Sequence, residues 1–190
     1  MSLAAQDPVV RVGVTVTFLR MDQPPTDPAP RFPDGFVVKR DRWCSVADYR
    51  FLYREVGDAY VWWLRRVMPD NQLAAMLRDP RVSIYILREQ GQPAGFYELD
   101  RTPWPVVNLS YFGLMPQAIG RRLGFPFLRH AVDAAWGMGP RAVTVNTCTA
   151  DHPRALPGYL RAGFMPLREV REEWNVPLRL NMPIPDALRL

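Results

Sequence analysis

Residues 112–124 read Phe-Gly-Leu-Met-Pro-Gln-Ala-Ile-Gly-Arg-Arg-Leu-Gly, and they join a predicted strand to a predicted helix. The strand covers 106–114, and the helix runs to about Trp136 with apolar residues spaced at i and i+4. Glycines at such a junction let backbone N–H groups approach an anion, and the helix N-terminus adds about half a positive charge. The junction therefore suits a phosphate or pyrophosphate, although the same glycines also suit a plain tight turn. It is neither a Walker A loop nor a G-x-G-x-x-G site.

The elements around this junction predict one mixed α/β domain. Upstream, strands at 82–88 and 94–100 form an antiparallel meander with 106–114, because hairpin-length turns connect them. Before the meander come two predicted helices, 46–56 and 59 to roughly 78, the second interrupted near 68–70, where Asp70 is suited to cap a new start. After the junction helix come a strand at 142–147, a short helix at 153–161 with Asp151, His152 and Pro153 as its cap and first turn, and a Gly163-Phe164 strand region.

The first 35 residues add a strand and a stiff connector to this core. Residues 9–20 alternate apolar and polar side chains, as a half-buried strand does, and residues 23–33 hold five prolines. A further short strand is expected at 36–40. The predicted organisation is a single domain with an N-terminal extension (1–35), a core (36–164) and a C-terminal strand and tail (165–190). The exposed edge of the added strand also suits a homodimer.

Composition narrows the class of protein. The chain has 190 residues, 48% of them hydrophobic and 23% charged, as in an ordinary globular domain. Its longest apolar run is 59–64, against the about 18 residues that span a bilayer. The first ten residues lack a basic region and an apolar core, so no secretory signal and a cytoplasmic location are expected. The net charge of +5 is the difference between 24 basic and 19 acidic residues, and Lys39 is the only lysine. The arginines are interleaved with acids, which argues against a nucleic-acid interface.

The order of elements and two motifs resemble the GNAT superfamily of acyl-CoA-dependent N-acetyltransferases. The resemblance covers roughly 36–164. Its first motif is a strand ending in Pro and then Arg/Gln-x-x-Gly-x-Gly/Ala; here Ile119 stands at the Arg/Gln position and Arg122 at the first glycine. The second motif is Asn-x-x-Ala-x-x-Leu-Tyr-x-x-x-Gly-Phe; here His152 replaces the asparagine, Gly158 replaces the leucine, and Tyr159 matches.

The resemblance implies acetyl-CoA as cofactor and names the residues that would hold it. Pantetheine would bind as an extra strand along Phe112, Gly113 and Leu114, with the Leu114 N–H aimed at the thioester oxygen. The pyrophosphate would lie on the loop, with His152 and Tyr159 facing the cofactor as well; the loop residues are Ile119, Gly120, Arg121, Arg122, Leu123 and Gly124. Arg121 and Arg122 are able to add charge-assisted hydrogen bonds, and are equally consistent with a solvated helix face.

Candidate catalytic residues follow from the chemistry of acyl transfer. By resemblance, Tyr159 protonates the departing thiolate, whose thiol has a pKa of about 8.5. An amine acceptor has to lose a proton first, and the strand position that carries a glutamate in some GNAT members holds Asn108, which is no base. Glu98 on the neighbouring strand is the candidate base, and Asp100 lies on the same face of that strand. Alternatively, both are ordinary solvated strand residues, or the amine loses its proton through water. Neither a serine triad nor a metal site is predicted, because His130 and His152 lack the necessary partners.

The sequence therefore predicts an enzyme that transfers an acetyl group from acetyl-CoA to a primary amine, on a small molecule or a peptide. Tyr60, Trp62 and Trp63 lie where helices wall the acceptor site in GNAT folds, although aromatic residues at this spacing also suit a core. Two alternatives stay open. One is a CoA-binding sensor or partner module without turnover, and the other is an arginine-rich nucleic-acid-binding domain.

Overall fold

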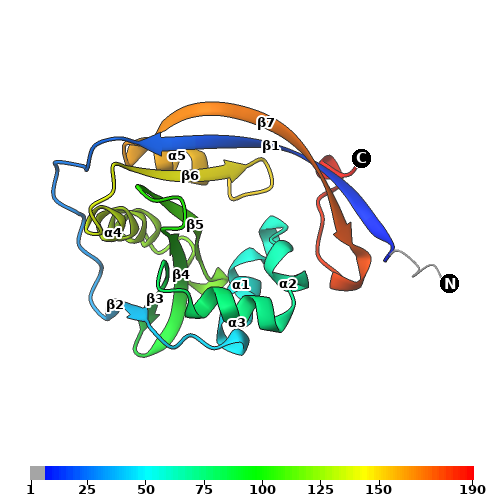
Figure 1. Ribbon diagram of the computed structural model, residues 1–190, viewed down its shortest axis with the longest axis horizontal. Coiled ribbons are helices and arrows are strands. Elements are labelled where there is room, and N and C mark those ends of the chain that lie inside the picture. Colours follow the sequence, from blue (N-terminus) through cyan, green and yellow to red (C-terminus); the bar gives the residue numbers. More distant parts are fainter. Residues whose placement is uncertain (1–6) are drawn as a thin grey trace.

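The computed structural model describes residues 7–190, and these residues form one seven-stranded sheet flanked by helices (Figure 1). Two predictions, the N-terminal extension and the absence of a signal sequence, concern in part residues 1–6, which lie outside the described residues. The strand order is β2-β3-β4-β5-β6-β1-β7, and every neighbouring pair is antiparallel except β5 and β6. The strands are β1 Val9–Met21, β2 Phe36–Asp41, β3 Val82–Glu89, β4 Gln92–Asp100, β5 Val106–Leu114, β6 Ala142–Cys148 and β7 Met165–Pro177.

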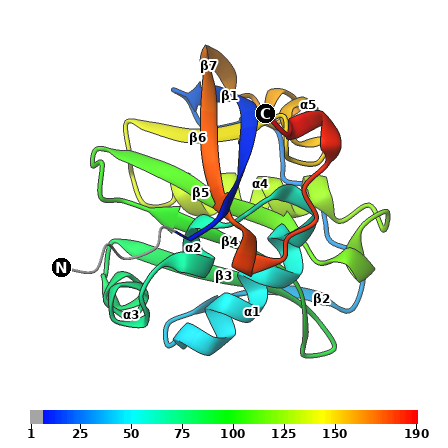
Figure 2. The same ribbon diagram turned by 90° about the vertical axis from the view of Figure 1, so that its right-hand side faces the viewer.

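Helices cover both faces of the sheet. The helices α1 and α3 pack on one face of β3–β5 around a core that includes Leu52, Leu73 and Phe96, and α4 packs on the other face (Figure 2). Within residues 7–190 no helix is long and apolar enough to cross a membrane. The helices are α1 Val46–Gly57, α2 Leu64–Val67, α3 Asp70–Arg78, α4 Gly124–Trp136 and α5 Ala155–Arg161, with 3₁₀ turns η1 Asp58–Tyr60, η2 Pro116–Ala118, η3 Leu178–Leu180 and η4 Asp186–Leu188.

The proline-rich connector, residues 23–33, crosses from β1 to β2 past α4 without helix or strand, as predicted (Figure 1). It is held by Arg129 of α4, whose side chain is 3% exposed. The Arg129 guanidinium donates to the Asp27 carboxylate at 2.7 Å and to the Asp27 carbonyl oxygen at 2.8 Å. A buried guanidinium needs such partners, because an unpaired charge in the interior is costly.

Three local expectations are wrong. The second helix does not begin at Ala59, because Val61 adopts a left-handed backbone (φ 56°) and regular helix resumes only at Leu64. Asp70 does not cap α3: Pro69 is the N-cap residue, and the Asp70 carboxylate instead accepts from Arg50 at 2.6 Å. Residues 151–153 do not cap α5, whose N-cap residue is Arg154.

The added N-terminal strand also differs from expectation, because β1 lies inside the sheet rather than at an edge. It pairs with β6 through Val16–Met21 and with β7 through almost its whole length. The homodimer prediction assumed that β1 is an outer strand with an exposed edge, and this assumption is wrong. Within residues 7–190 the outer strands of the sheet are β2 and β7.

Candidate active site

The parallel strands β5 and β6 separate halfway along their length. They pair with each other from Val106–Ala142 to Leu109–Val145. Beyond this point β5 continues to Leu114 and β6 to Cys148, but the two strands no longer pair with each other. The separation coincides with a bulge: Leu99 of β4 faces Leu109, but Glu98 faces Tyr111, so Ser110 is an extra residue in β5. A bulge bends its strand, and this one turns the end of β5 away from β6. We call the unpaired region between 110–114 and 146–148 the β5–β6 opening.

The β5 edge of this opening carries unpaired backbone groups. The Met115 N–H donates to the Ala94 carbonyl on the β4 side at 2.9 Å. Because N–H directions alternate along an extended chain, the N–H groups of Leu114 and Phe112 point to the opposite side, into the opening. Gly113, between them, is closely covered on the face that packs against α1, because a Cβ at this position would overlap the Val56 side chain. The Phe112–Leu114 backbone predicted to hold pantetheine is thus free to pair with an extended ligand.

The loop that follows β5 leads into an uncapped helix terminus. Gly120 has φ 82° and Arg122 has φ 61°, and within residues 7–190 nothing beyond the adjoining residues lies within 4 Å of the position that a Gly120 Cβ would take. The helix α4 begins at Gly124 with no side-chain cap, and Pro126 in its first turn has no N–H. The first-turn N–H groups of this 13-residue helix are therefore left for an anion or water, next to the end of β5.

The two loop arginines point to different surroundings. Arg121 forms a two-pronged ion pair with Glu89, both N–O distances being 2.6 Å, and its guanidinium stacks over Phe36 at 5.0 Å. Its side chain is thereby engaged with the β2–β3 side of the molecule. Arg122 is exposed and forms no ion pair among residues 7–190. Of the two, only Arg122 has its charge free for a phosphate.

Tyr159 of α5 lies on the α4 face of the opening. Its ring is 6.5 Å from that of Phe112 and 5.9 Å from that of Phe164, measured between centroids, and the residue is only 6% exposed. Burial raises the pKa of its hydroxyl above the ordinary value for tyrosine, and the negative charge of Asp151 adds to the effect. A neutral hydroxyl beside the predicted pantetheine strand has the protonation state that a proton donor needs.

Glu98 lies on the opposite face, beneath α1, and is 1% exposed. One carboxylate oxygen accepts from the Tyr49 hydroxyl at 2.5 Å and the other from the Arg65 guanidinium at 3.0 Å. Burial raises the pKa of Glu98, and the Arg65 charge partly offsets the rise. At 1% exposure the carboxylate is closed off from an acceptor amine, so acting as a base would require a movement of the side chains that cover it. Its neighbour Asp100 lies at the end of β4, where it accepts from Thr102 at 2.7 and 2.9 Å.

A second carboxylate, Asp151, faces the opening, and sequence reasoning missed it by assigning it to a helix cap. It lies three residues after the end of β6, and one of its oxygens accepts from the Thr147 hydroxyl at 2.8 Å and the Cys148 N–H at 2.9 Å. Its other oxygen accepts from the Trp62 indole N–H at 3.3 Å. The signal in the sequence was its position in the turn that follows the predicted strand at 142–147.

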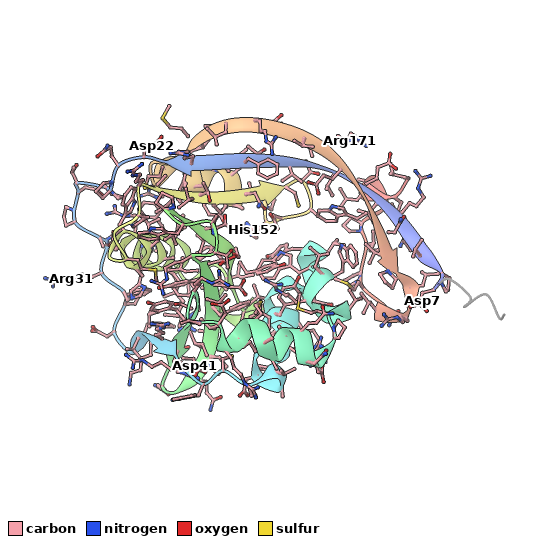
Figure 3. The ribbon with its side chains drawn as sticks, in the orientation of Figure 1. Asp7, Asp22, Arg31, Asp41, His152 and Arg171 are labelled. Carbon is pink, nitrogen blue, oxygen red and sulfur yellow. The ribbon has the colours of Figure 1, made fainter. Side chains whose placement is uncertain are left out.

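The aromatic residues predicted to wall the acceptor site separate into two groups. The Trp62 ring lies 5.0 Å from Tyr111, and Tyr60 lies 6.1 Å from His152, so both reach the opening. Figure 3 shows His152 between β6 and the helices α1 and α2, in agreement with its contact to Tyr60. Trp63 instead packs in the small core formed by β1, β7 and the C-terminal tail. Within residues 7–190 no cluster of side chains is suited to hold a metal ion.

A seven-stranded mixed sheet, with an opening between parallel strands above a helix N-terminus, defines an acyl-CoA N-acyltransferase fold. The family model described as acetyltransferase (GNAT) matches residues 49–164, more than half of the chain. The chain therefore belongs to the GNAT family. A search of curated proteins found no match.

Solved structures share the fold at low sequence identity. A GCN5-related N-acetyltransferase from Sphaerobacter thermophilus is 20% identical with a TM-score of 0.61, over 89% of this chain and 53% of that one. One from Kribbella flavida is 18% identical with a TM-score of 0.59, over 90% and 63%. An aminoglycoside acetyltransferase from a soil metagenome is 13% identical with a TM-score of 0.56, over 68% and 88%. The chain thus spans less than two thirds of the first two proteins.

Proposed function

We propose that the protein transfers an acetyl group from acetyl-CoA to a primary amine within a ternary complex. The observation that carries the proposal is the unpaired backbone of Phe112 and Leu114, which points into the β5–β6 opening beside the uncapped N-terminus of α4. An extended amide-bearing arm joined to a pyrophosphate matches both features at once. The aminoglycoside acetyltransferase of similar fold is an example of a protein named for an amine-bearing acceptor.

The residues of the opening divide the work of acyl transfer. The Leu114 N–H would stabilise the oxyanion that develops when the amine nitrogen attacks the thioester carbon. As the C–N bond forms and the C–S bond breaks, Tyr159 would donate its hydroxyl proton to the leaving sulfur. The tyrosinate would then recover a proton from the new amide nitrogen, which carries one too many. Starting from the neutral amine, the net products are the acetylated amine and free CoA, and the only proton released is the one that the ammonium form loses beforehand.

The ammonium form of the acceptor has to lose a proton before it attacks. Glu98 stays the predicted base for this step, and because it is 1% exposed and bonded to Tyr49 and Arg65, its use requires these side chains to move. A variant that keeps the shape but removes the basicity, Glu98→Gln, would slow turnover at saturating amine if the prediction holds. Deprotonation by water would leave the rate dependent only on the fraction of neutral amine, which rises with pH.

The first test is thermal unfolding with acetyl-CoA, with ATP and a random DNA duplex as controls. At about 100-fold above the dissociation constant a ligand stabilises the folded state by about 2.7 kcal/mol, or roughly 5–10 °C at this size. A shift with acetyl-CoA alone supports the cofactor. No shift at saturating acetyl-CoA overturns the proposal, and a shift with DNA alone supports a nucleic-acid-binding domain instead.

The second test is release of free CoA with a panel of primary amines, followed through the new thiol. Turnover with any amine, above the rate without amine, supports the transferase. A protein that binds acetyl-CoA but releases no CoA with any member of a broad panel acts as a sensor or partner module rather than as an enzyme.

A further inference from the structure

Asp151 is a carboxylate held in place without a counter-ion. Its three donors, Thr147, Cys148 and Trp62, are all neutral, and no arginine forms an ion pair with it among residues 7–190. A carboxylate offers about four acceptor positions, so three donors leave it one free. In a chain with a net charge of +5, an oriented carboxylate that forms no ion pair within residues 7–190 is available to bind a cation from outside.

The position of Asp151 ties it to the β5–β6 opening from both faces. On the α1 face, Trp62 bridges the two strands: its N–H reaches Asp151 after β6, and its ring lies 3.7 Å from where a Gly113 Cβ would stand on β5. On the α4 face lies Tyr159, whose pKa is raised mainly by burial and further by the negative charge of Asp151. The carboxylate therefore lies on the β6 side of the opening and is linked to the β5 side through the Trp62 side chain.

Glu98, the other carboxylate near the opening, is not comparable. It is 1% exposed and already paired with Arg65, whereas Asp151 is partly exposed. The surroundings of Asp151 are also aromatic, since the Trp62 ring is 5.0 Å from Tyr111, and Tyr60 is 6.1 Å from the adjacent His152. Aromatic faces attract ammonium groups and also pack against apolar chains.

We propose that Asp151 binds the ammonium group of the acceptor, while Trp62, Tyr111 and Tyr60 contact its stem. The acceptor class is then a primary amine on a short apolar or aromatic stem, positively charged when it arrives. The inference rests on the proposed function, because it concerns the acceptor side of the same site. It makes the free oxygen position of Asp151 the feature that separates amines from neutral molecules of the same shape.

The experiment compares amines with matched alcohols on protein saturated with CoA. The probes are 2-phenylethylamine with 2-phenylethanol and hexylamine with hexanol, each titrated by calorimetry. The wild-type protein should bind at least one amine about 10-fold to 100-fold more tightly than its alcohol, the range expected for a hydrogen bond to a charged group. Asp151→Asn should abolish that preference, because the amide keeps an oxygen for Thr147 and Cys148 but carries no charge.

The matched control is Asp58→Asn, which removes an exposed carboxylate in the adjacent turn η1 that pairs with Arg66. It should keep the wild-type preference for the amine. If Asp151→Asn does not fold, the amide spectrum of the wild-type protein gives the answer: the signals of Asp151 and His152 should shift with the amine and not with the alcohol.

Two results overturn the inference alone. One is a wild-type protein that binds CoA but prefers neither amine, and the other is an Asp151→Asn variant that keeps the preference. A protein that does not bind CoA at all overturns the proposed function instead. The two failures are therefore distinguishable in one series of titrations.

Discussion

At the scale of single residues, Glu98 and Arg65 form a buried ion pair beneath α1. Replacing Glu98 by glutamine keeps the volume but leaves the Arg65 charge, 19% exposed, without its partner. Loss of one member of a buried ion pair costs about 3–5 kcal/mol, so Glu98→Gln should lower the free energy of unfolding by an amount in this range. Urea unfolding of the two proteins measures the difference.

The control for this prediction is Tyr49→Phe, which removes one hydrogen bond to Glu98 and leaves the ion pair intact. It should cost less, about 1–3 kcal/mol, because a single buried acceptor position loses its donor. Equal stability of Glu98→Gln and the wild-type protein would contradict the prediction and would free Glu98 for a purely catalytic role.

His130 gives a pH dependence whose sign follows from its burial. Its Nδ1 is 2.8 Å from the Tyr97 hydroxyl on the inner side of α4, and burial lowers its pKa below the ordinary 6.5. The unfolded chain therefore takes up a proton at a higher pH than the folded one, and stability falls as the pH drops from about 6.5 toward the folded pKa. Urea unfolding at pH 8 and at pH 5.5 should show this loss.

The variant His130→Gln removes the titrating group, so the part of the pH dependence that belongs to this residue should disappear. The nearby charge is Asp133, which favours the protonated imidazole and works against the burial effect. An identical loss of stability in the variant and the wild-type protein would assign the pH dependence to other groups.

At the scale of elements, a negative charge at the N-terminus of α4 should affect helix stability and cofactor binding in opposite directions. Gly124→Asp places a carboxylate at the first helical position, where a Cβ meets only Leu114 Cδ1 at 4.0 Å. A negative charge there favours the helix by about 0.3–1 kcal/mol, so the melting temperature without ligand should stay the same or rise. The same charge repels a pyrophosphate, so the shift with acetyl-CoA should be lost.

Gly124→Ala is the matched variant, because it adds the Cβ without the charge. It should retain the shift with acetyl-CoA. If Gly124→Asp shows the full wild-type shift, the cofactor does not place its pyrophosphate on this helix.

Local signals in the sequence were sufficient for most elements. The i, i+4 pattern of α4 and the hairpin-length turns of the meander predicted elements that the structure confirms, because each signal is a property of neighbouring residues. The left-handed Val61 was not predictable, since a β-branched residue ordinarily avoids positive φ. It is fixed by surroundings far along the chain, which bring Trp62 against Tyr111 and Asp151.

The candidate site was predictable to the same extent. The loop residues Gly120 and Gly124 and the Phe112–Leu114 strand were found from motifs, since each is a continuous stretch. The bulge at Ser110 and the place of Asp151 were not, because both depend on which strand pairs with which. The partners of Glu98 were equally hidden, since Tyr49 and Arg65 lie 49 and 33 residues before it.

At the scale of the whole molecule, β1 is the element that joins the two ends of the chain. It lies between β6 and β7, so within residues 7–190 β1 is the strand through which β7 joins the sheet. Its alternating pattern predicted a strand but not this location, because a strand pattern carries no information about its neighbours. The family model begins at residue 49, whereas β1, which comes before that residue, is a strand of the same sheet.

Amide hydrogen exchange, resolved by residue, tests this arrangement. Residues 16–20 of β1 have a strand on both sides, so their N–H groups should be protected without interruption. In β7, residues 171–176 have a neighbour on one side, so protected and fast-exchanging amides should alternate. Fast exchange throughout β1 would contradict the strand order. Continuous protection along β7 that fades on dilution would place a second copy of the chain on its outer edge, because that edge is the one β1 leaves unpaired.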